Sequence, residues 1–172
     1  MTAYVALLRG VNLLGVSTLK MDDLRAIAQQ LRLGSPRTFI ASGNLLFVSG
    51  RNEKSLQRLI AKAVTERMGR SVGVTLRTAK EMIAVVKGNP FGDQAGNMVQ
   101  AFFLNAPPPE DALEMARNID DERIALGKRE IYVAYGERGI GKSRLRLPLA
   151  EAGTARNMNS VAKMAELLTG ME

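Results

Sequence analysis

The stretch RTFIASGNLLFV, residues 37–48, decides the fold. Two short apolar runs, 37–41 and 44–48, are joined by Ser-Gly-Asn, which is typical of a β-hairpin. The hairpin stands between two segments with helical periodicity. Two strands in direct succession inside a series of strands and helices break a simple β-α-β alternation, so the pattern predicts an α+β fold.

The segments on either side of the hairpin extend this prediction. Residues 2–8 form an apolar run that predicts a buried strand, and 21–31 predict an amphipathic helix with an acidic first turn. After the hairpin, Asn52 caps a second predicted helix, which Gly69 ends. An alternating strand over 71–78 completes the order strand-helix-strand-strand-helix-strand, the ferredoxin-like split βαβ arrangement.

The second half predicts a related series. Its elements are a helix from Thr78 to about Lys87 with Thr78 and Glu81 as a capping box, a strand over 98–105, a helix over 107–118, a hairpin over 122–135 and a final helix capped by Thr154. We therefore expect two ferredoxin-like-related halves, 1–78 as βαββαβ and 79–172 as αβαββα. Because no low-complexity linker separates them, we expect the halves to pack together around a cleft.

The composition excludes several kinds of chemistry. The chain has no cysteine and no histidine, which rules out thiol nucleophiles, disulfides, Ser-His-Asp triads and zinc sites built on those ligands. The remaining acid and base candidates have no spacing that places two of them around one substrate; they are Asp93, Glu110, Asp111, Tyr135 and Glu137. No catalytic constellation, cofactor or metal site is predicted, and enzymatic activity stays open.

The charge and the apolar runs bear on location and partners. The longest apolar runs fall far short of a membrane helix and no secretory leader precedes the first run, so we expect a cytoplasmic protein without membrane contact. Lysine and arginine number 24 against 17 acidic residues, a net charge of +7, which favours anionic partners. The basic residues are scattered and form no tail, which is equally compatible with an ordinary solvated surface.

Residues 136–143, GERGIGKS, fit the spacing G-x-x-x-x-G-K-[ST] of a nucleotide-binding P-loop. The strand before them belongs to a predicted hairpin, whereas a P-loop needs parallel crossover strands after the motif. The residues that follow Ser143 contain a proline-bearing segment and one helix, too little for such a sheet. We interpret the match as a coincidence and place Lys142 at the mouth of the expected cleft.

Four segments in the same order as in a known family carry a resemblance. These are YVALLRGVN, SGNLLF, NPF and TARNMNSV, spread from Tyr4 to Val161. The chain resembles the bacterial domain-of-unknown-function family 1697, which has an LLRGIN-type strand end, an SGN-type hairpin and a late TRNWNT-type segment. The resemblance implies a two-part α+β fold and no established reaction. Met158 and Ser160 replace the Trp and Thr of the last motif, which argues against aromatic stacking there.

Polar clusters at the ends of predicted elements are the candidate ligand-binding residues. A helix N-terminus and nearby arginines suit an anion, so we expect these clusters to meet in the cleft and to bind an anionic small molecule or polyanion. The alternatives are a self-association module with structural polar motifs, or weak nucleic-acid binding without an RNP1-like aromatic pattern. The candidates are Arg9, Asn12, Ser42, Asn44, Lys142, Arg156, Asn157 and Asn159.

Overall fold

The structure is a computed structural model that describes residues 1–11 and 18–172. Contacts divide the chain into two units: Met1–Glu81 with Met164–Glu172, and Met82–Lys163. Each unit contains a four-stranded antiparallel sheet packed with helical segments. The predicted α+β class is confirmed.

The first unit follows the predicted order of elements. They are β1 (Thr2–Leu8), α1 (Met21–Gln30), β2 (Gly34–Thr38), β3 (Asn44–Ser49), α2 (Glu53–Met68) and β4 (Val74–Thr78). The strands lie in the order β2-β3-β1-β4 with antiparallel neighbours, which is the ferredoxin-like arrangement. Asn52 Oδ1 accepts the Ser55 N–H at 2.9 Å and Gly69 ends α2 in the left-handed region, so both predicted caps are confirmed.

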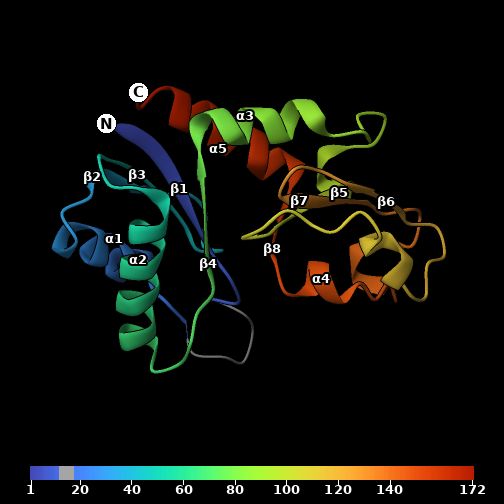
Figure 1. Ribbon diagram of the computed structural model, residues 1–172, viewed down its shortest axis with the longest axis horizontal. Helices are drawn as coiled ribbons and strands as arrows, with labels where there is room; N and C mark the ends of the chain where they lie inside the picture. Colours follow the sequence, from blue (N-terminus) through green and yellow to red (C-terminus); the bar gives the residue numbers. More distant parts are fainter. Residues whose placement is uncertain (12–17) are drawn as a thin grey trace. The chain divides into compact units, whose positions relative to one another are not determined.

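Both faces of the first sheet are removed from water. On β1, Tyr4, Ala6 and Leu8 belong to one core cluster, while the alternate residues 3, 5 and 7 are fully buried on the opposite face. The rings of Tyr4 and Phe47 stack with centroids 5.8 Å apart. Helices α1 and α2 contact each other and cover the face that carries this cluster (Figure 1).

The second unit repeats the strand order of the first. Its elements are η1 (Gly96–Met98), β5 (Val99–Phe103), η2 (Ala112–Met115), β6 (Arg123–Leu126), β7 (Glu130–Ala134), η3 (Ile140–Lys142), α4 (Pro148–Glu151) and β8 (Thr154–Asn157). The sheet order β6-β7-β5-β8 corresponds strand for strand to β2-β3-β1-β4. Two longer helices, α3 (Ala79–Gly88) and α5 (Met158–Thr169), follow the last strands of the two sheets.

The last strand of each sheet carries a buried arginine followed by a helix cap. Arg77 and Arg156 are 1% and 8% exposed, and each donates from Nη1 to the preceding carbonyl at 2.8 Å. Thr78 Oγ1 accepts the Glu81 N–H at 3.2 Å, which confirms the predicted capping box, and Asn157 Oδ1 accepts the backbone N–H three residues on at 2.9 Å. This shared pattern supports the relation between the two halves.

The helix predicted over 107–118 is wrong. Only the short 3₁₀ helix η2 forms there, and Ala116 after it is already extended. Arg117 then pairs with Arg146 through two backbone hydrogen bonds of 2.8 and 2.9 Å. Because an extended bridge is incompatible with a helical turn, this long-range pairing overrides the local preference for helix.

The cap predicted at Thr154 is also wrong. Residues 154–157 form β8, which pairs with β5 in the register Phe103↔Thr154 to Gln100↔Asn157. The last helix therefore begins at Met158, three residues later than predicted, with Asn157 as its cap. Ladder hydrogen bonds to a strand far away in the sequence keep these residues extended.

No helix in the described residues is long and apolar enough to cross a lipid bilayer.

Gly43 provides a test of the hairpin that organises the first sheet. Its φ is +87°, and an added Cβ would lie 2.5 Å from Val11 Cγ2 and 3.0 Å from Leu8 Cβ. We expect Gly43→Ala to lower the free energy of unfolding by about 2–4 kcal/mol in urea titrations. The loss has two causes, the strain of a left-handed backbone that carries a Cβ and the overlap of this Cβ with its neighbours. At Gly50 a Cβ would meet only Met1 Sδ at 3.6 Å, so Gly50→Ala should change stability by about 0.5 kcal/mol or less. Equal effects of both substitutions would contradict this assignment.

Candidate functional site

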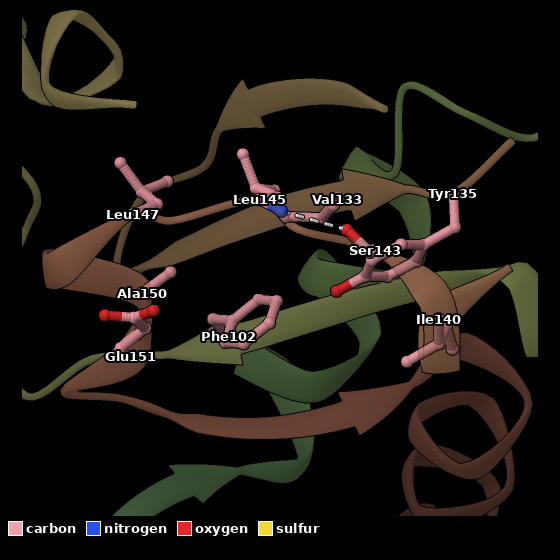
Figure 2. A pocket seen from close by; sticks show the side chains of 9 residues that line it. All are labelled: Phe102, Val133, Tyr135, Ile140, Ser143, Leu145, Leu147, Ala150 and Glu151. Atoms are coloured by element: carbon pink, nitrogen blue, oxygen red, sulfur yellow. Dashed lines mark hydrogen bonds between the residues drawn. The ribbon is translucent and has the colours of Figure 1, made fainter. Parts of the chain in front are cut away.

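A small cavity lies within the second unit, on the face of its sheet that carries Phe102 and Val133. Its volume is about 130 Å³. Figure 2 shows Phe102 between two groups of side chains, with Tyr135, Ile140 and Ser143 on one side. Ile140 and Glu151 are themselves exposed, so the cavity reaches the surface. We call it the second-unit cavity; its lining is Phe102, Val133, Tyr135, Ile140, Ser143, Leu145, Leu147, Ala150 and Glu151.

The cavity exists because this face is thinly covered. In the first unit the two connections that cross the equivalent face contain α1 of 10 residues and α2 of 16 residues. In the second unit the corresponding connections contain the four-residue η2, and the three-residue η3 with the four-residue α4. Accordingly Ala6 and Leu8 on β1 are fully buried, whereas Gln100 and Phe102 on β5 stay partly exposed.

Residues 142–147, KSRLRL, form the roof of the cavity. Ser143, Leu145 and Leu147 line it, and the residues between them are basic and exposed. A chain with period-2 alternation presents alternate side chains to opposite sides. The roof therefore places apolar groups against the sheet and cationic groups toward solvent.

A buried carboxylate holds the roof in place. Glu122, which is 7% exposed, accepts the Ser143 Oγ–H at 2.5 Å and the Asp120 N–H at 2.8 Å. The Ser143 hydroxyl also accepts the Leu145 N–H at 3.3 Å, as drawn in Figure 2. The hydrogen bond from Ser143 is the main cause that lowers the pKa of Glu122, and the bond from Asp120 adds to it. The hydrogen bonds of Glu122 to Ser143 and Asp120 thus anchor the roof.

Tyr135 is a fixed hydrogen-bond donor in the wall. Its Oη donates to Gln100 Oε1 at 2.9 Å, and its side chain is buried. Burial raises its pKa to about 12, and the charge of Glu122 adds to the shift. The phenol therefore stays protonated at neutral pH, and the cavity wall beside it is uncharged.

The charged groups around the roof differ in their partners. Arg146 and Glu151 form an ion pair with Nε and Oε1 2.8 Å apart, so the carboxylate in the lining is largely balanced. Within residues 1–11 and 18–172, neither Lys142 nor Arg144 has an ion-pair partner. Two positive charges at the roof are thus available to an anion.

The P-loop-like stretch contributes this roof and has a different topology from a P-loop. The preceding strand β7 is antiparallel to both of its neighbours, and the stretch continues into the three-residue η3. Gly139 has φ of +71° and the Ser143 hydroxyl is bonded to Glu122. The stretch is a turn pinned by a buried carboxylate.

The predicted site residues of the first unit lie at one end of its sheet. Arg9 directly follows β1, and the Leu8 N–H donates to the Gly43 carbonyl at 2.9 Å, which brings the hairpin turn beside this strand end. Asn44 is fully buried and donates from Nδ2 to the Phe39 carbonyl at 2.8 Å and to Ser42 Oγ at 3.1 Å. Asn44 thus stabilises the turn. Asn12 lies outside the described residues.

The other predicted residues belong to the second unit. Arg156 lies within β8, Asn157 caps α5, and exposed Asn159 lies against Gly96. Desolvation lowers the pKa of Arg156 to about 10, which leaves its guanidinium charged at neutral pH. Lys142 is exposed at the end of η3. That the predicted residues of each unit contact a ligand, and that both groups contact the same ligand, stay predictions.

The sequence analysis missed the cavity and the anchor of its roof. Glu122 and Ser143 are 21 residues apart, so no local pattern links them. Phe102 and Val133 come from different strands that become neighbours only in the sheet. The alternation of basic and other residues in 142–147 is the one feature of the sequence that indicates this roof.

The Glu122–Ser143 bond predicts a specific pH dependence of stability. Because the folded-state pKa of Glu122 is lowered, its stabilising contribution is present above the unfolded-state pKa and is lost as pH falls through the folded value. We expect the difference in unfolding free energy between wild type and Glu122→Gln to be largest near neutral pH and to shrink below about pH 4.3. Ser143→Ala should weaken this dependence in urea titrations across pH, and an unchanged pH profile in both variants would contradict the anchoring role.

Comparison with known proteins agrees with the fold and gives a family. The structure is similar to the conserved bacterial protein SP0830 from Streptococcus pneumoniae, with a TM-score of 0.80 over 98% of this chain and 99% of that chain. At 22% identity this likeness shows the fold alone. No curated protein is significantly similar in sequence. Residues 1–132, well over half of the chain, match the family described as protein of unknown function (DUF1697), so the chain belongs to the DUF1697 family, as its sequence motifs predicted.

Proposed function

We propose that the chain binds a small organic anion in the second-unit cavity, with the apolar part of the ligand inside and its charge near the roof. The observation that carries this proposal is the alternation in residues 142–147. Ser143, Leu145 and Leu147 line the cavity, Arg144 between them is an exposed cation, and exposed Lys142 directly precedes Ser143 at the end of η3. One short segment thus offers both kinds of contact that such a ligand needs.

The chemistry of the cavity supports a non-covalent binding role. Its lining is mainly aliphatic and aromatic, and apolar pockets with a few polar groups at their edge are typical of small-molecule sites. The polar atoms of Ser143 and Tyr135 already have hydrogen-bond partners in the protein. They therefore shape the site, and the long side chains of Lys142 and Arg144 supply flexible charge around it.

Polyanion binding and self-association stay predictions of the sequence. The net charge of +7 supports weak, salt-dependent attraction to any anionic polymer. A small cavity with a mainly apolar lining suits a small molecule better than a polymer, and for that reason we prefer the small organic anion.

Titration calorimetry with hexanoate tests the proposal. We expect saturable binding to wild type, weakened about 2–5-fold by Lys142→Ala and by Arg144→Ala, because each removes one exposed charge. Lys128→Ala removes an equally exposed charge from the β6–β7 turn and should leave affinity unchanged. Hexanamide should bind less tightly than hexanoate. Equal affinity for both probes, or no effect of either roof substitution, would refute the anion proposal.

A further inference from the structure

We infer that the second-unit cavity accepts a single aromatic ring, so that its ligand is a monocyclic aromatic carboxylate. This inference rests on the proposed function and specifies the part of the ligand that is buried. It follows from the size of the cavity, the side chains that form its walls and the position of the charges outside it.

The volume sets the size of the buried group. The cavity measures about 130 Å³. An apolar cavity of about 150 Å³ in another protein holds one benzene molecule. A six-membered ring therefore fits, whereas two fused rings exceed this volume.

The walls favour a flat, apolar group. Phe102 on β5 and Tyr135 after β7 both contribute rings to the lining, and aromatic pairs in offset or edge-to-face geometry gain stability beyond the area that they bury. Figure 2 shows the Phe102 ring in the middle of the lining side chains and Tyr135 beside Ser143. The Tyr135 hydroxyl already donates to Gln100, so Tyr135 contributes mainly its ring to the lining.

The charges favour a carboxylate outside the ring. Glu151 lines the cavity, and its ion pair with Arg146 reduces the cost of bringing a second carboxylate near. Lys142 and Arg144 then supply the attraction. A ring with one carboxylate complements the mainly apolar lining and the exposed cations of the roof segment together.

Calorimetric titration of the whole chain with four probes tests the inference. The probes are benzoate, acetate, 1-naphthoate and hexanoate. We expect benzoate to bind about 10-fold or more tightly than acetate, because burial of the ring supplies most of the affinity. Naphthoate should bind at least about 5-fold less tightly than benzoate because the cavity holds one ring. Hexanoate should bind less tightly than benzoate, since its flexible chain loses conformational freedom and lacks ring contacts.

Two substitutions, one in α4 and one directly after it, locate the ring. Ala150 is buried and lines the cavity, so Ala150→Leu should fill it and lower the affinity for benzoate about 10-fold or more. Ala152, two residues on, is exposed and outside the lining, and Ala152→Leu should leave the affinity unchanged. Thermal unfolding of both variants checks that they are folded. If Ala150→Leu is unstable, Phe102→Leu keeps an apolar wall without its ring and should bind benzoate more weakly while hexanoate changes less.

The outcomes separate this inference from the proposed function. Equal binding of hexanoate and benzoate, with both weakened by Lys142→Ala, would overturn the aromatic ring and leave the organic anion in place. Benzamide bound as tightly as benzoate would overturn the anion and retain the ring. Tight naphthoate binding, or benzoate binding unaffected by Ala150→Leu in a folded protein, would overturn the assignment of the ring to this cavity.

Discussion

Apolar side chains on both faces of each sheet are the constraint on which the structure depends. In the first sheet the residues of β1 are buried on both faces, so two layers of cover are required. Helices α1 and α2 provide one of these layers, and Leu24, Leu56 and Ile60 beneath them are fully buried. The hydrophobic effect stabilises such an arrangement in proportion to the area removed from water.

The second sheet has the same strand order but a weaker cover, and this difference creates its candidate function. The segments η2 and α4 are too short to cover this face completely: Val133 is buried, but Phe102 stays partly exposed. Two long-range contacts, the Arg117–Arg146 bridge and the Ser143–Glu122 hydrogen bond, hold the covering chain in place. The result is a cavity beneath a cationic segment. It forms where the second unit has short segments in place of the long helices of the first unit.

The sequence predicted what local chemistry determines. The caps at Asn52 and Thr78 depend on neighbours within a few residues, and both are confirmed. The predicted hairpin forms as the pairing of β2 with β3, but its first strand covers Gly34–Thr38 and not 37–41. Strand β8 and the extended bridge at Arg117 depend on partners far along the chain, and in both places a helix was predicted instead. The cavity was missed for the same reason, since Phe102 and Val133 become neighbours only through the sheet register. Local periodicity does not report which faces remain poorly covered.

Methyl-resolved NMR during a benzoate titration tests the central claim most directly, because it reports where a ligand lies without any substitution. The account predicts saturable shifts with one common affinity at Val133, Ile140, Leu145 and Leu147, which line the cavity. The methyl resonances of Leu24, Leu56 and Ile60 in the core of the first unit should not shift. Shifts absent from the cavity methyls, or spread equally over both sets, would contradict the claim that the thinly covered face of the second sheet is the binding site.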